Sequence, residues 1–72
     1  MSMTQHQAIL NYINDFGSIT PMEAFSDLGI TKLATRIGEI RRSGVDIEKT
    51  EVKGTNRYGE ATRYMRYSFP KN

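Results

Sequence analysis

Residues 20–44 read TPMEAFSDLGITKLATRIGEIRRSG and decide the fold of this chain. The stretch opens with the start signals of a helix: Thr20 is a typical N-cap, Pro21 suits the first helical position, and Glu23 completes a capping box. Gly29 is the stop signal, because glycine readily adopts the left-handed conformation that ends a helix. We therefore expect a short helix between Thr20 and Gly29. Its apolar surface would come from Met22, Ala24, Phe25 and Leu28.

A second helix follows directly after this glycine turn. Thr31 is expected to cap it, and the helix is expected to cover residues 32–43 and to end at Gly44. Its core stripe at helical spacing is formed by Leu33, Ile37 and Ile40. Two helices joined by a short turn that contains glycine predict a helix-turn-helix unit. The alternative for this segment alone is a plain helical hairpin in some other small domain.

The chain before this unit predicts one more helix. Thr4 is a suitable N-cap, Gln7 completes a capping box, and Gly17 is the stop signal. The apolar residues of this helix follow helical spacing: Ala8, Ile9, Tyr12, Ile13 and Phe16. Ile19, just after the stop signal, is expected to be buried in a brief extended segment.

After Gly44 the pattern changes to that of a β-hairpin. Two β-prone stretches, residues 45–52 and 61–69, flank a segment with two glycines and an asparagine. We place the hairpin tip at residues 53–60. Three helices followed by a hairpin, with a possible short third strand near Ile19, predict an α+β winged helix-turn-helix fold. The whole chain, residues 1–72, is expected to form one domain.

Three short runs carry a resemblance to a known family: GSITPMEA at residues 17–24, LGI at 28–30 and NRYG at 56–59. Further matching positions are Arg36, Ile37, Ile40, Arg41 and Gly44. Together these motifs span nearly the whole chain and resemble small winged-helix proteins that are common in bacteriophages and prophages. The resemblance implies that the third helix enters the major groove of DNA and that the hairpin is the wing.

Charge is divided unevenly along the chain. All ten Lys and Arg residues lie from Lys32 onward, whereas the first 31 residues carry three acids and no base. The first part therefore has a formal charge of −3, and the rest, with ten bases against five acids, has a charge of +5. Clustered positive charge attracts polyanions, so the third helix and the hairpin form a surface suited to nucleic acid.

We predict that this surface binds double-stranded DNA. The phosphates would be neutralised by Lys32, Arg42, Lys53, Arg57 and Arg63, with Asn56 and Tyr58 as further contacts at the hairpin tip. The bases would be read by Thr31, Lys32, Thr35, Arg36 and Glu39. Two alternatives stay open. Glu39 is a candidate partner of Arg42 or Arg36 on its own helix, and Arg36 is a candidate partner of Asp27 or Glu39.

Two further positions are candidates for contact with DNA. The backbone amides at the start of the second helix, residues 21–23, are expected to hold a phosphate, with the Thr20 hydroxyl nearby. Gly38 lies on the outward face of the third helix, where a glycine costs up to ~1 kcal/mol relative to alanine. Close approach of another backbone would explain this glycine, and simple tolerance is the alternative.

Catalysis finds little support in the sequence. His6 is the only histidine and is expected to be a surface residue at a helix start. There is no cysteine, no metal-ligand spacing and no glycine-rich phosphate loop. We therefore expect a non-enzyme without metal, cofactor or small-molecule ligand. No apolar stretch approaches the ~20 residues that span a membrane, so we expect no membrane partner and a cytoplasmic location.

Three functions fit these observations. The first is a sequence-specific DNA-binding regulator of transcription, for instance of phage genes. The second is an excisionase-like architectural protein that bends DNA. The third is a winged-helix module that binds or inhibits a host protein in a nucleic-acid-handling or defence complex. The aromatic residues that keep the third function open are Tyr58, Tyr64, Tyr67 and Phe69. Homodimerisation through the first helix or the hairpin also stays open.

Overall fold

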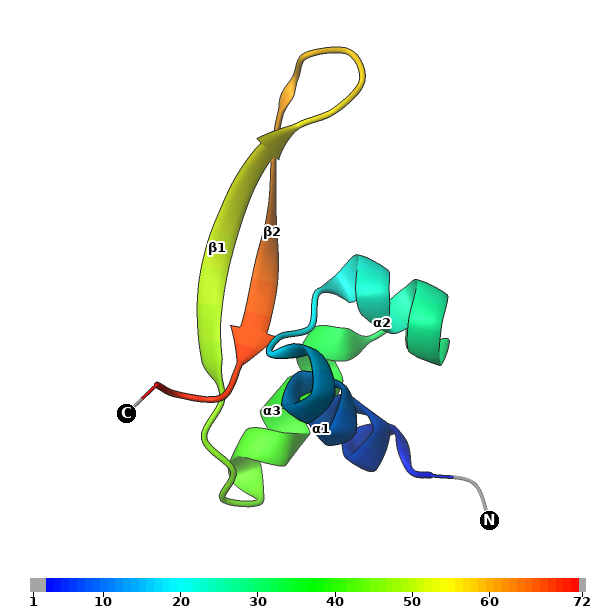
Figure 1. Ribbon diagram of the computed structural model, residues 1–72, viewed down its shortest axis with the longest axis vertical. Coiled ribbons are helices and arrows are strands. Elements are labelled where there is room, and N and C mark those ends of the chain that lie inside the picture. The colour runs from blue at the N-terminus through cyan, green and yellow to red at the C-terminus, as the bar shows by residue number, and fades with distance from the viewer. Residues whose placement is uncertain (1–2, 72) are drawn as a thin grey trace.

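The structure is a computed structural model that describes residues 3–71. Three helices come first: α1 (Gln5–Phe16), α2 (Pro21–Leu28) and α3 (Leu33–Arg42). Two antiparallel strands, β1 (Glu48–Thr55) and β2 (Ala61–Ser68), follow as a hairpin. The helices group together, and the hairpin extends well beyond them (Figure 1). The predicted α+β architecture of three helices and a terminal hairpin is confirmed.

The first two helices begin and end where the sequence predicted. The Thr20 hydroxyl accepts a hydrogen bond from the Glu23 N–H at 3.3 Å, and the Glu23 carboxylate accepts one from the Thr20 N–H at 3.0 Å. Thr4 caps α1 by accepting from the Gln7 N–H at 3.1 Å. Within residues 3–71 no bond returns from the Gln7 side chain, so Thr4 is a simple N-cap rather than part of a capping box.

Helix α3 begins differently from the prediction. Its N-cap is Lys32, which makes no side-chain capping bond, and Thr31 lies in the exposed turn before it. The prediction that Thr31 caps this helix is therefore wrong. The turn is fixed by other means, because Ile30 is buried in the core and its N–H donates to the Ala24 carbonyl at 2.9 Å. An apolar anchor and a backbone bond replace the side-chain cap.

The core lies between the three helices and the base of the hairpin. It consists of Ile9, Ile13, Ile19, Ala24, Ile30, Leu33, Ile37, Ile40, Ile47 and Tyr67. The predicted core stripe of α3 is confirmed, since all three of its members are buried. Each fully buried isoleucine contributes about 1.5–3 kcal/mol relative to an exposed one. The core therefore depends mainly on branched aliphatic side chains and includes one tyrosine.

Three large apolar side chains that the sequence assigned to the helix faces are exposed instead. Phe16, Met22 and Phe25 are 71%, 72% and 59% exposed. Helix α2 has only eight residues and turns Ala24 and Leu28 inward, which places Met22 and Phe25 on its other side. Phe16 is the last residue of α1 and lies beyond the core, where its ring contacts that of Tyr12 at 4.6 Å between centroids.

One extended residue of the helical part, Ile19, pairs with the hairpin through its backbone. Ile19 and Tyr67 exchange two backbone hydrogen bonds, of 2.8 and 2.9 Å, and both side chains are buried. The predicted burial of Ile19 in an extended segment is thus confirmed. The hairpin tip is shorter than predicted, because strand pairing continues to Thr55 and Ala61 and leaves residues 56–60 as the loop.

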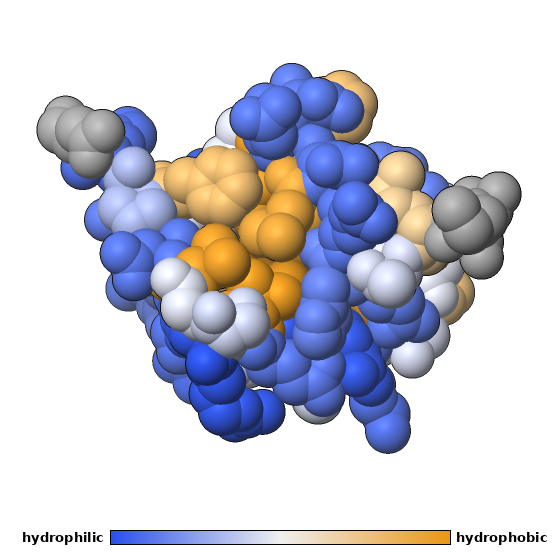
Figure 2. Space-filling view, turned by 90° about the horizontal axis from the view of Figure 1, so that it is seen from below, coloured by the Kyte–Doolittle hydropathy of each residue, from blue (hydrophilic) through white to orange (hydrophobic). Residues whose placement is uncertain are grey.

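Apolar side chains reach the surface at the end of the domain opposite the hairpin tip (Figure 2). Figure 2 views the molecule from below, the end away from the hairpin tip, and shows apolar side chains that reach the surface within a surround of hydrophilic ones. In the part of the chain that the structure describes, none of the helices combines the length and the apolar character that crossing a membrane requires.

Candidate nucleic-acid interface

The outward face of α3 presents a small set of polar side chains. Lys32, Thr35 and Arg42 are exposed on the side of the helix opposite the core stripe. None of the three side chains forms a hydrogen bond or ion pair within residues 3–71, so their polar atoms are available to a ligand. Gly38 lies among them, and a Cβ at this glycine would meet only Nη1 of Arg42, at 4.0 Å.

Glu39 and Arg36 are held differently, because they form a three-residue cluster with α1. The same Glu39 oxygen, Oε1, lies 2.7 Å from Nε2 of His6 and 2.8 Å from Nη1 of Arg36. The hydrogen bond from His6, and then the bond and charge of Arg36, hold the pKa of Glu39 below its ordinary value. Glu39 is therefore charged and paired with Arg36, as the alternative interpretation had it.

This cluster changes what α3 offers to a ligand. The carboxylate that could accept from a cytosine already accepts two bonds from the protein. Arg36 is only partly exposed, and its buried Nε has no hydrogen-bond partner among the described residues. His6, expected to be a simple surface residue, joins α1 to α3 by a bond to a residue 33 positions away in the sequence. Arg36 and Glu39 are thus partly buried and paired with each other, whereas Thr31 is exposed in the turn before α3.

Arg41 connects α3 to the hairpin. Its Nε and Nη2 donate to the carbonyl oxygen of Ile47 at 3.1 and 2.8 Å, which fixes the segment that leads from the helix into β1. Apart from the position of Arg41 on the flank of the helix, nothing in the sequence indicated this contact. Arg41 therefore has a structural role, and the basic character of this helix overstates the charge available to DNA.

The two strands of the hairpin place a pair of cations opposite each other. Lys53 of β1 pairs with Arg63 of β2 in the register. Side chains alternate along a strand, so this pair lies on the same side as Met65 and Tyr67, which face the core. Both cations border a surface hollow of about 380 Å³. Like charges directly opposite each other destabilise a hairpin, and an anion between them removes that cost.

The hairpin tip adds a further cation and an aromatic ring. Asn56 Oδ1 accepts from the N–H groups of Tyr58 and Glu60 at 2.9 and 3.1 Å, and Asn56 Nδ2 donates to the Glu60 carboxylate at 3.2 Å. Asn56 thus shapes the loop with its own side chain. Arg57 and Tyr58 are exposed, Tyr58 to 80%. Both are free to contact a ligand.

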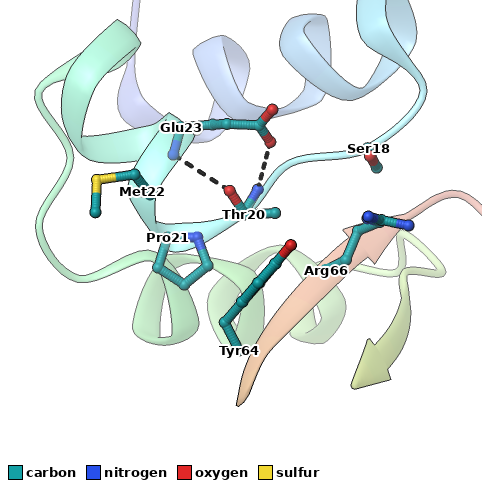
Figure 3. A pocket seen from close by; sticks show the side chains of 7 residues that line it. All are labelled: Ser18, Thr20, Pro21, Met22, Glu23, Tyr64 and Arg66. Atoms are coloured by element: carbon teal, nitrogen blue, oxygen red, sulfur yellow. Dashed lines mark hydrogen bonds between the residues drawn. The ribbon is translucent and has the colours of Figure 1, made fainter. Parts of the chain in front are cut away.

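The predicted phosphate site at the start of α2 does not fit the structure. Figure 3 shows the Glu23 carboxylate folded back over the helix start, where it exchanges hydrogen bonds with Thr20. The backbone N–H groups of Glu23 and Thr20 therefore already donate within the protein, and the carboxylate repels a phosphate. The adjacent pocket of about 610 Å³ is lined by Ser18, Thr20, Pro21, Met22, Glu23, Tyr64 and Arg66.

Nothing in the described residues forms a metal-binding group of three or more His, Cys, Asp or Glu side chains. Comparison with known families matches residues 4–72 to a winged helix-turn-helix domain. The match covers nearly all of the sequence, so the chain belongs to this family. No curated protein and no solved structure matches it. Membership in this family agrees with the observed order of helices and hairpin and indicates DNA as the partner.

Proposed function

We propose that this winged helix-turn-helix domain is a sequence-specific DNA-binding protein that regulates transcription, of the kind found in phages and prophages. It acts by binding rather than by catalysis, on double-stranded DNA in a bacterial cytoplasm. Helix α3 enters the major groove, and the hairpin lies along the phosphate backbone. The resemblance of the sequence to small phage and prophage proteins supports this role, and the family supports DNA as the partner.

The observation that carries the proposal is the Lys53–Arg63 pair on the hairpin. Two cations opposite each other in an exposed ladder repel, and nothing within residues 3–71 neutralises either of them. A phosphate lodged between the two side chains converts this repulsion into two attractions. The hairpin extends well beyond the helices (Figure 1), and the pair and Arg57 lie in its outer part, away from the Ile19–Tyr67 bridge.

Helix α3 supplies the sequence reading. Lys32 and Arg42 can donate to the guanine edge, and the Thr35 methyl group suits the methyl group of thymine. Both charges and the hydroxyl are unused by the protein itself. The neighbouring Glu39 is paired with the charge of Arg36, so its negative charge does not oppose the approach of phosphates.

Selection of bound sequences from random duplex DNA tests the proposal. We expect one recurring motif, and an affinity whose logarithm falls against the logarithm of salt concentration with a slope of about −2.7 for the three phosphate contacts of the hairpin. Tight binding without a motif would favour an excisionase-like architectural role. Absence of DNA binding would overturn the proposal and favour a host protein as the partner.

A charge reversal in the hairpin tests the role of the Lys53–Arg63 pair. Lys53→Glu/Arg63→Glu keeps the like-charge repulsion across the strands but reverses its sign, and should abolish DNA binding without further loss of stability. The matched control compares the single variants Lys53→Glu and Lys49→Glu, which reverse one charge each on β1, near the tip and near the base of the hairpin. Equal loss of affinity in both variants would show that only net charge matters.

A further inference from the structure

Phe16 lies between two hollows of the surface that carry different charge. The first, of about 470 Å³ between α1 and α2, is lined by Met3, Ala8, Asn11, Tyr12, Asp15, Phe16, Asp27 and Leu28. The second, also of about 470 Å³, lies beside the base of the hairpin and is lined by Phe16, Gly17, Ser18, Glu48, Thr50, Arg66, Ser68 and Lys71. Phe16 is the residue that the two hollows share.

The charges on the two sides of Phe16 are complementary. The first hollow contains the carboxylates of Asp15 and Asp27 and no base. The second contains Arg66 and Lys71 against one acid, Glu48. Within residues 3–71 none of these five side chains forms an ion pair. The surface therefore combines a 71% exposed aromatic ring with an acidic side and a basic side. Asp27 accepts a hydrogen bond from the Tyr12 hydroxyl, but within residues 3–71 neither side has an ion-pair partner.

We propose that this surface binds a second copy of the chain in a two-fold symmetric dimer. A two-fold axis beside Phe16 places the two rings together and sets the acidic side of each copy against the basic side of the other. In such an interface every contact occurs twice, so one favourable acid–base pairing is doubled. A uniformly acidic or basic partner would attract one side and repel the other, and only a partner with the same division of charge satisfies both.

The dimer leaves the proposed DNA-binding surface free. Neither the exposed face of α3 nor the Lys53–Arg63 pair lines either hollow. A dimer formed here would present two copies of that surface with two-fold symmetry, as palindromic DNA sites require. The dimer itself does not depend on DNA binding, so the two proposals can fail separately.

Sedimentation equilibrium of the full chain without DNA tests the dimer. We expect a reversible monomer–dimer equilibrium in the unaltered protein. Phe16→Ser should raise the dissociation constant on the order of tenfold to a hundredfold, because exposed aromatic residues at the centre of an interface dominate its affinity. The matched control is Phe25→Ser, which removes another exposed phenylalanine that lines neither hollow and should leave the equilibrium unchanged.

An exchange of charge tests the symmetry. Asp15→Arg alone and Arg66→Glu/Lys71→Glu alone should each dimerise more weakly, since each sets like charges against each other. An equal mixture of the two variants should restore dimerisation, because each copy then supplies the charge that the other needs. Restoration supports the two-fold arrangement, and its failure overturns it.

Three other outcomes would also overturn the proposal. These are an unaltered protein that stays monomeric at all concentrations, equal effects of Phe16→Ser and Phe25→Ser, and species larger than a dimer. A further measurement distinguishes failure of the dimer from failure of the proposed function. It is the binding of the Phe16→Ser variant to a short duplex that contains a single half-site. If that binding persists while dimerisation never occurs, only the dimer is wrong.

Discussion

Helix α3 and the hairpin form one candidate surface, but they are held in the molecule in different ways. Helix α3 is fixed by its buried stripe, by the bond of Glu39 to His6 of α1, and by the bonds of Arg41 to the Ile47 carbonyl. Beyond the Ile19–Tyr67 bridge, the hydrogen bonds of the hairpin within the described chain join hairpin residues only to one another.

This difference matches two tasks in DNA recognition. Base edges are read by hydrogen bonds that require side chains in fixed positions, whereas contacts with phosphates tolerate a mobile charged arm. The structure gives the fixed positions to Thr35 and its neighbours on α3 and the projecting charges to Lys53, Arg57 and Arg63. We therefore expect substitutions in α3 to change stability and sequence preference, and substitutions in the hairpin to change affinity for any sequence.

The largest expected effect is on the anchoring of α3. Ile37→Ala should lower the free energy of unfolding by ~2–5 kcal/mol, because it opens a cavity at a side chain that is buried where α3 meets α1. Chemical denaturation measures this loss. The counterpart in the hairpin is Val52→Ala, at a half-buried position, where we expect a smaller loss. Equal losses would show that the hairpin is as firmly anchored as the helix.

The next largest effect distinguishes the role of α3 in DNA binding from that of the hairpin. Thr35→Ala should weaken binding to the best site by ~1–3 kcal/mol and hardly change binding to random duplex, because it removes a base contact. Arg57→Ala should weaken binding to both alike, because it removes a phosphate contact. Fluorescence titrations with the selected site and with random duplex measure the split. If Arg57→Ala instead alters the preferred bases, the hairpin tip enters a groove and the division of tasks is wrong.

The features of the fold that depend on residues close together in the sequence could be predicted. The capping box at Thr20, the left-handed glycine turn at Gly29 and the period of the α3 stripe are local, so they could be recognised and the fold derived from them. The bonds from His6 to Glu39 and from Arg41 to Ile47 depend on how the elements pack, which no spacing reveals. The exposure of Phe16 also escaped prediction, since periodicity shows which side chains align but not where the core ends.

A smaller effect concerns Gly38. Gly38→Ala should stabilise the folded protein by up to ~1 kcal/mol, because alanine is the better helix former and the new methyl group meets only the flexible end of Arg42. If the DNA backbone approaches this position closely, the same variant should bind DNA more weakly despite its higher stability. Thermal unfolding and DNA titration of one variant therefore distinguish close approach from simple tolerance. Unchanged DNA affinity would show that the glycine is merely tolerated.

The smallest effect is the pH dependence of the bond between α1 and α3. The folded-state pKa of Glu39 lies below the ordinary value of 4.5, so its pairing with His6 and Arg36 contributes stability that is fully present above that value. The contribution is lost as the pH falls through the lowered pKa and Glu39 becomes protonated. Denaturation at a series of acidic pH values should therefore show the advantage of the unaltered protein over Glu39→Gln shrinking toward zero. Glu51→Gln in β1 is the matched control, because it replaces a carboxylate by an amide in the same way and Glu51 forms no ion pair within the described chain. If the stability difference for Glu39→Gln changes with pH no more than that for Glu51→Gln, the cluster does not hold α3 in place. The contrast with the hairpin would then rest on the buried stripe and Arg41 alone.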